Sequence, residues 1–241
     1  MRIPVKAGTS EYFFPQNVDW AGKVIDKLVV CAPSLACIDP VDGQTPVLTS
    51  ADVDALFFNL YRADGSELFH DISVEQIVHY NNNGIEVHEA LALENCKMYF
   101  NTAPVADGTL LIYVFYNTKA AEDYDYPTNS VTITFPLDAG QEISLKELIN
   151  TYISAIPEDI KGIQFWDAES NPAYITLRDD ALTYTLQNIH SEMARSGMVG
   201  ISAKDTQANI MLFDNINVNM HYSYIRNATA SANTQTLTFL Y

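Results

Sequence analysis

The sequence predicts a mainly β protein made of two tandem antiparallel β-sandwich, jelly-roll-like domains with one or two short helices. Short apolar segments alternate with turn residues about every 8–12 positions, a spacing typical of sandwiches and barrels rather than of βαβ units. Segments of the first half also resemble segments of the second, which indicates a repeat of about half the chain. The paired segments are residues 10–16 and 131–137, 55–65 and 173–181, and 98–117 and 211–241. With 241 residues and 48% hydrophobic content, the chain is long enough for two packed domains.

The expected strands of the first half follow from alternating or continuous apolar runs. They are residues 12–14, 23–32, 55–62, 66–72, 87–100 (one or two strands) and 110–116. Asp64-Gly65 lies between two of these runs and predicts a hairpin, whereas the breaker-rich residues 33–46 predict a loop. The last run, LLIYVFY, is apolar throughout and is expected in a core. The first six residues, MRIPVK, hold only two basic residues, which favours a ragged terminus over a basic arm.

The acidic segment 119–129 is interpreted as a linker, with an N-terminal domain at 1–121 and a C-terminal domain at 122–241. After it, residues 144–154 have apolar side chains at helical spacing, with Ser144 as N-cap and Glu147 at the capping-box position. Residues 182–195 fit either a helix or a strand. The remaining expected strands are 131–136, 162–166, 173–177, 209–213, 219–225 and 236–241.

Composition limits the partners. Lys and Arg number 13 against 30 Asp and Glu, so the net charge is −17. This charge disfavours strong direct binding to nucleic acid and to anionic membranes, because phosphate contacts need clustered basic residues. Only 18% of residues are charged, while 14 are Tyr and 11 are Phe. Such a surface is typical of proteins with many contacts inside large assemblies.

The three cysteines, Cys31, Cys37 and Cys96, are an odd number in apolar surroundings. They predict buried, reduced thiols rather than a disulfide framework. No secretory apolar region follows Met1, and no apolar run approaches the roughly 20 residues of a membrane span. The sequence therefore predicts a protein made in a reducing cytoplasm, without a membrane span.

A search for chemistry assigns no catalytic residue, no cofactor and no metal ligand. Histidines 79, 88, 190 and 221 lack a second ligand at zinc-like spacing, and HEALA at 88–92 has alanine where a zinc-protease helix needs histidine. Gly-x-Ser-x-Gly and a phosphate-binding loop are also missing, and the glycosylation pattern at 227–229 is treated as chance. Paired acids are interpreted as solvated turn residues, with Ca²⁺ between subunits as the alternative. These acids are Asp39/Asp42, Asp52/Asp54, Glu122/Asp123/Asp125 and Asp179/Asp180.

The opening segment at 9–28, TSEYFFPQNVDWAGKVIDKL, resembles the start of virion structural proteins from phages of Bacteroidetes hosts. In those proteins an aromatic-Phe-Pro element precedes a Lys-x-Ile strand, as at 13–15 and 23–25 here. The tandem β halves are similar to double-jelly-roll major capsid proteins of tailless icosahedral phages. The resemblance implies a virion location after synthesis in the host cytoplasm, self-association and contacts with other virion proteins. It implies no small-molecule substrate and no enzyme activity.

The sequence therefore favours a non-enzymatic capsid subunit that self-assembles through the sides of its β domains. A minor or decoration protein of the virion is the alternative in the same class. A carbohydrate-binding or adhesin module, with aromatic residues along a sugar face, is the alternative from another class. A hydrolase is the third, because glycosidases pair their carboxylates in space and leave no local motif.

Overall fold

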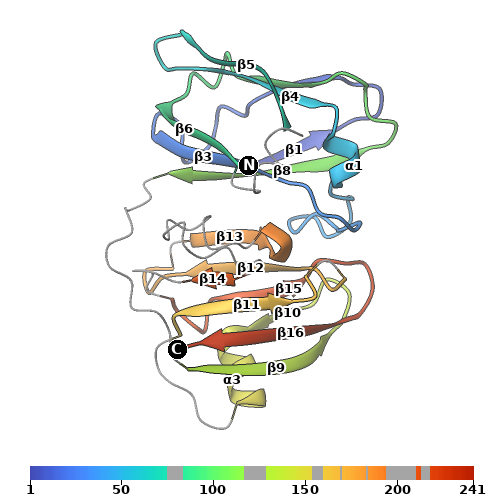
Figure 1. Cartoon of the computed structure of the whole chain (residues 1–241), viewed down its shortest axis with the longest axis vertical. Helices are drawn as coiled ribbons and strands as arrows, with labels where there is room; N and C mark the ends of the chain where they lie inside the picture. The colour runs from blue at the N-terminus through green and yellow to red at the C-terminus, as the bar shows by residue number, and fades with distance from the viewer. Residues whose placement is uncertain are drawn as a thin grey trace. The chain divides into compact units, whose positions relative to one another are not determined.

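A computed structural model of the chain describes residues 1–74, 84–116, 129–153, 160–168, 170–182, 184–193, 210–212 and 218–241. The chain divides into two compact units. The first comprises Met1–Ala36 and Thr45–Thr118, and the second comprises Cys37–Gln44 and Lys119–Tyr241. Within each unit, two antiparallel four-stranded sheets form two layers (Figure 1). The predicted mainly β fold class is confirmed.

The first unit holds eight described strands and a one-turn helix, α1 (Ser50–Val53), which the sequence did not predict. Its sheets have the strand orders β1-β8-β3-β6 and β2-β7-β4-β5. The strands are β1 (Arg2–Val5), β2 (Glu11–Phe13), β3 (Val24–Cys31), β4 (Leu56–Tyr61), β5 (Glu67–Ser73), β6 (Ile85–Ala90), β7 (Lys97–Phe100) and β8 (Gly108–Tyr116).

The core of the first unit is filled by alternate residues of the two facing sheets. Leu110 and Ile112 of β8 pack in one buried cluster with Phe58 of β4 and Met98 of β7. The apolar run of β8 was expected in a core, and the side chains at 108–113 are buried on both faces of the strand. The predicted hairpin is also present, because Gly65 has a φ of 82° in the turn that joins β4 to β5.

The second unit has eight described strands and the helix α3 (Leu145–Tyr152). The hydroxyl of Ser144 accepts a hydrogen bond from the Glu147 backbone N–H at 3.1 Å, so the predicted N-cap is confirmed. The sheet orders are β9-β16-β11-β14 and β10-β15-β12-β13. The strands are β9 (Ser130–Leu137), β10 (Glu142–Ser144), β11 (Gly162–Trp166), β12 (Ala173–Arg178), β13 (Tyr184–His190), β14 (Ile210–Leu212), β15 (Tyr224–Asn227) and β16 (Asn233–Leu240).

The two units have the same strand order. Adding eight to each strand label of the first unit gives both sheets of the second. An eight-strand sandwich of two four-stranded sheets with these crossed connections is a jelly roll. The predicted tandem repeat is therefore confirmed at the level of topology.

The repeat is real, but the sequence paired some of its segments wrongly. Residues 55–65 and 173–181 were matched correctly, since they contain β4 and β12. Residues 10–16 contain β2, whereas 131–137 lie in β9, the counterpart of β1. The pair 98–117 and 211–241 was correct in part: β8 and β16 correspond, whereas the second segment begins in β14 and not in β15, the counterpart of β7. Every strand pair of a sandwich has an apolar-turn-apolar pattern, so short similarities do not identify the position of a strand.

The structure also decides the predictions for the N-terminus and for residues 182–195. The first residues are not a ragged terminus, because Arg2–Val5 pair with Gly108–Leu111 as a sheet edge. The ambiguous segment 182–195 forms the strand β13 followed by the short 3-10 helix η1 (Ser191–Met193). The predicted boundary between residues 121 and 122 lies outside the described residues, as does most of the predicted linker. The domains 1–121 and 122–241 therefore stay a prediction. That prediction placed residues 37–44 in the first domain, whereas the structure groups them with the second unit.

Candidate functional site: the interaction surfaces

The described residues hold no group of three or more His, Cys, Asp or Glu side chains that could bind a metal ion. His88 and His221 are exposed, His190 is buried, and His79 lies outside the described residues. Asn227 is buried, and the two N–H groups of its side-chain amide are shared among three backbone carbonyls within 3.2 Å, so this side chain fixes the local backbone.

Among the described residues, several of the paired acids accept hydrogen bonds that stabilise the local backbone or a nearby loop. Asp52 accepts hydrogen bonds from the N–H and hydroxyl of Thr49 at the start of α1. Asp180 accepts one from Asn219 at 3.1 Å. Asp39 is fully buried, so its interpretation as a solvated turn residue is wrong. The acids at 122, 123 and 125 lie outside the described residues.

Residues 37–44, which we call the strap, belong to the second unit although they precede it by many residues in the chain. The strap is held by three side chains that we call the clamp: Arg226 of β15, Tyr174 of β12 and His190 of β13. These three residues are direct register neighbours across adjacent strands. Because side chains alternate along a strand, the clamp lies on the sheet face opposite to buried Ile175 and Ile225.

Each clamp residue contacts a different residue of the strap. Arg226 donates from Nη1 to the Pro40 carbonyl at 2.7 Å, and the Tyr174 hydroxyl donates to the Ile38 carbonyl at 3.0 Å. His190 Nε2 lies 3.3 Å from the Cys37 sulfur. The backbone N–H of Ile38 also donates to the Ala228 carbonyl at 2.9 Å. The sequence predicted a loop here, and the structure shows a loop with specific partners.

The Cys37–His190 pair is buried and uncharged, which separates it from a catalytic thiolate–imidazolium pair. Burial lowers the pKa of His190 to about 3 and raises the pKa of Cys37 to about 12. The backbone N–H of Glu192 donates to His190 Nδ1 at 3.2 Å, so the ring proton lies on Nε2 and is donated to the sulfur. The pair is a neutral hydrogen bond that fastens the strap.

The three cysteines are buried and free, as the sequence predicted. Burial also raises the pKa of Cys96, whose sulfur accepts a hydrogen bond from the Tyr61 backbone N–H at 3.3 Å. Nucleophilic cysteines require the opposite shift, because the thiolate is the reactive form.

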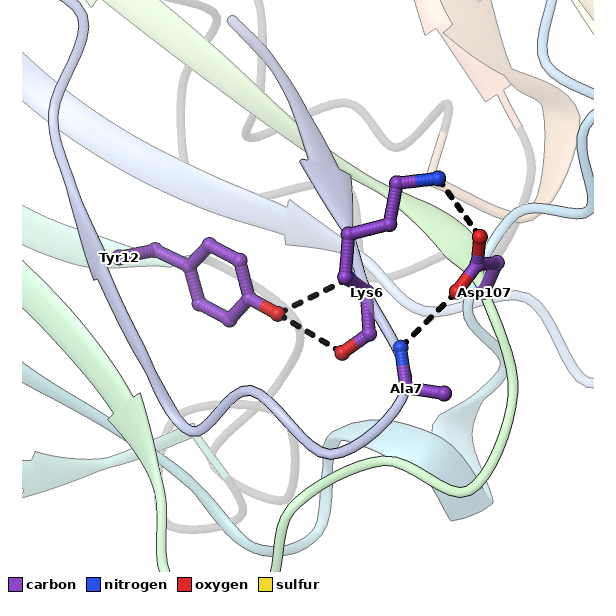
Figure 2. Close-up of polar contacts among 4 residues, drawn as sticks. All are labelled: Lys6, Ala7, Tyr12 and Asp107. Atoms are coloured by element: carbon purple, nitrogen blue, oxygen red, sulfur yellow. Dashed lines mark hydrogen bonds and ion pairs between the residues drawn. The ribbon is translucent and has the colours of Figure 1, made fainter.

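One loop of the first unit is fixed by a polar cluster that Figure 2 shows. Asp107, just before β8, accepts from Lys6 Nζ at 2.6 Å and from the Ala7 backbone N–H at 2.9 Å. The Tyr12 hydroxyl accepts from the Lys6 backbone N–H at 2.9 Å and lies 3.1 Å from the Lys6 carbonyl. This hydrogen bonding raises the pKa of Lys6 and lowers that of Asp107. The cluster joins the β1–β2 loop to the segment before β8, whose Val105 is 97% exposed.

An aromatic patch lies on the outer face of the sheet β2-β7-β4-β5. Phe57 and Tyr99 are register neighbours whose rings stack with centroids 5.4 Å apart. Phe13 on the adjacent β2 is 62% exposed. Glu11 and Lys97 of the same strand pair form an ion pair at 2.9 Å. Phe57 and Tyr99 are partly buried, and aromatic side chains on a surface are enriched at protein contacts.

The sheet β9-β16-β11-β14 has an outer face of a different kind. We define the threonine face as Thr132 and Thr134 of β9, Thr236 and Thr238 of β16, and Trp166 of β11. The hydroxyls of Thr132 and Thr238 lie 2.8 Å apart, and those of Thr134 and Thr236 lie 3.1 Å apart. The indole N–H of Trp166 donates to the Thr238 hydroxyl at 2.7 Å. The face was not singled out from the sequence, although the alternating VTIT and TQTLT patterns mark it.

Comparisons with known proteins give distant structural likenesses only. No family model and no curated protein matches the chain. A chain from the atomic structure of Sulfolobus Turreted Icosahedral Virus is similar over 100% of this chain and 88% of its own, with 10% identity and a TM-score of 0.25. The major capsid protein P2 of bacteriophage PM2 is similar over 99% of this chain and 96% of its own, with 11% identity and a TM-score of 0.29. The strand order is therefore the evidence for the fold.

Proposed function

We propose that this chain is a non-enzymatic virion structural protein, namely a capsid subunit that self-assembles through the sides of its two jelly rolls. The observation that carries the proposal is the identical strand order of the two units. Jelly rolls occur chiefly in viral capsids, lectins and cupins. A second copy of the same sandwich doubles the number of flat sheet faces that one subunit offers to its neighbours.

The other jelly-roll functions have less support. A cupin site needs clustered metal ligands, and none occurs among the described residues. A lectin needs a sugar-binding site, for which the exposed indole of Trp166 is the specific observation. Its N–H is already bonded to Thr238, however, and the surrounding hydroxyls are bonded to one another. A carbohydrate-binding module is therefore the second candidate.

Charge supports a shell that does not bind the genome directly, since the net charge is −17. No helix in the described parts of the chain is long and apolar enough to cross a membrane. The virion location, the other virion proteins as partners, a phage of Bacteroidetes as the source and a role for Ca²⁺ between subunits belong to the same proposal.

Sedimentation velocity at micromolar concentration, with and without Ca²⁺, tests the proposal, followed by electron microscopy of the fast-sedimenting species. We expect rings or closed shells of uniform size, because closed symmetry satisfies every contact. A 26.9 kDa monomer at all concentrations, also missing from purified particles, would contradict it. Binding of that monomer to a glycan array would favour the second candidate.

A further inference from the structure

We propose that the threonine face of the second unit is a subunit contact whose partner is a second copy of this chain. The inference rests on the proposed function and adds the surface that carries the contact. Three properties of the face support it: its charge, the pairing of its polar atoms and its regular geometry.

The charge of the face differs from that of the chain. The four strands β9, β16, β11 and β14 contain no Asp, Glu, Lys or Arg. Two copies that each carry a net charge of −17 repel one another, and a carboxylate buried at their contact would lose its hydration. A face without ionisable groups avoids both penalties. This favours a partner that is itself acidic, such as another copy, over a basic partner that would need acidic side chains.

The threonine hydroxyls and the indole N–H of the face are already paired within the sheet. Thr132 with Thr238, and Thr134 with Thr236, share hydrogen bonds between their hydroxyls. The indole N–H of Trp166 is bonded to Thr238. Burying such groups under a protein partner leaves few unsatisfied donors or acceptors. A sugar, in contrast, is recognised by convergent groups that are free to bond to the ligand.

The backbone beneath the face is regular. All eight residues of β9 pair with β16 from Ser130–Leu240 to Leu137–Asn233 without a bulge. Trp166 of β11 lies beside this strand pair. The residue is 47% exposed, and the hydrogen bond to the Thr238 hydroxyl fixes the orientation of its ring. Tryptophan is among the residues that carry most of the binding energy at protein contacts.

The size of the face predicts a weak contact that becomes stable in an assembly. Eight-residue strands about 27 Å long and about 4.8 Å apart project to roughly 400 Å² for this sheet. A standard stable interface buries about 800 Å² on each partner. The whole outer side of this sheet, of which the threonine face is the centre, thus supplies about half of such an interface, and simultaneous contacts elsewhere strengthen it. We therefore expect a steep dependence of assembly on concentration.

Fluorescence of Trp166 measures whether the face is covered. The chain has two tryptophans, and Trp20 is in the core of the first unit, so Trp20→Phe leaves Trp166 as the reporter. For the unassembled chain, the difference between the spectra of the parent and Trp166→Phe gives the Trp166 emission without a core substitution. On assembly we expect a blue shift of the Trp166 emission and at least a threefold loss of acrylamide quenching.

A charge placed on the face tests the contact directly. Thr134→Glu puts a carboxylate on the exposed side of β9, and Thr102→Glu is the matched control on an exposed residue of the first unit. We expect Thr134→Glu to raise the concentration needed for assembly at least tenfold and the control to leave it unchanged. Circular dichroism and thermal melts of the unassembled proteins test whether both variants are folded.

The outcomes separate this inference from the proposed function. A parent that stays monomeric contradicts both. A parent that assembles while Trp166 stays quenchable, and while Thr134→Glu assembles normally, contradicts only the assignment of the face. A shift of Trp166 emission in the monomer on adding neutral oligosaccharides overturns the assignment in favour of sugar binding.

Discussion

Acidification should destabilise the fold through His190, whose imidazole is buried in the clamp. The folded pKa of His190 is about 3, against an ordinary value of 6.5 in an unfolded chain. Because the folded pKa is the lower one, the unfolded chain binds the extra proton. The contribution of His190 is therefore complete above pH 6.5 and is lost as the pH falls from 6.5 towards 3.

The size of the effect follows from the difference between the two pKa values. At pH 5 the unfolded imidazole is about 1.5 pH units below its pKa, whereas the folded one is still neutral. At about 1.4 kcal/mol per unit, the free energy of unfolding should fall by about 2 kcal/mol between pH 7.5 and pH 5. The stability of the whole chain depends on many ionisable groups, so the contribution of His190 must be isolated by a variant.

Urea denaturation at pH 7.5 and pH 5 provides the measurement, on the parent, His190→Gln and His221→Gln. His190→Gln should be less stable at pH 7.5, because the Glu192 N–H and the Cys37 sulfur lose their partner. Its stability should nevertheless fall by about 2 kcal/mol less than that of the parent on acidification. His221→Gln removes an exposed imidazole outside the clamp and serves as the control for the substitution itself. Equal pH dependence of the parent and His190→Gln would refute the reasoning.

Three further predictions concern the thiols, the strap and the loop of Figure 2. Thiol reagents should react slowly with the native chain and should find three thiols after denaturation, since all three cysteines are buried and free; rapid native reaction would contradict this. Tyr174→Phe should lower the free energy of unfolding by about 1 kcal/mol through loss of the bond to the Ile38 carbonyl, while Tyr222→Phe, at an exposed ring, should not. Asp107→Ala should speed hydrogen exchange at the Ala7 amide with little change in melting temperature, because exposed ion pairs contribute little to stability. A large drop in melting temperature would show that the cluster has a greater role.

The fold class was predictable because period-two alternation records which face of a strand is buried. In β9 the pattern SVTITFPL alternates exposed and buried side chains as the sequence indicated. The helix α3 was predictable from its N-cap at Ser144. Like the alternation in a strand, an N-cap is a local pattern that neighbouring residues alone define. The register of individual strand pairs was not predictable, because pairing within a sheet joins residues such as Val131 and Phe239 that are distant in the chain.

The strap contacts and the threonine face could not be predicted from the sequence alone. The clamp depends on the register of three strands, which brings Arg226, Tyr174 and His190 into one row. The sequence analysis noted only that His190 lacks a second metal ligand at zinc-like spacing, and no local pattern links it to Cys37. The sequence of the threonine face does have one distinctive feature: its strands contain no charged residue. That signal becomes informative only when the strands are known to be neighbours.

The strap is synthesised long before the strands that bind it. Ile38 leaves the ribosome 136 residues before Tyr174, and Pro40 leaves it 186 residues before Arg226. At translation rates of about 5–20 residues per second, this segment waits on the order of ten seconds for its partners. A chain that stops before β15 lacks Arg226 and the carbonyl of Ala228 that receives the Ile38 N–H. Prematurely terminated chains should therefore keep the segment undocked and open to proteases, so that only full-length chains become resistant.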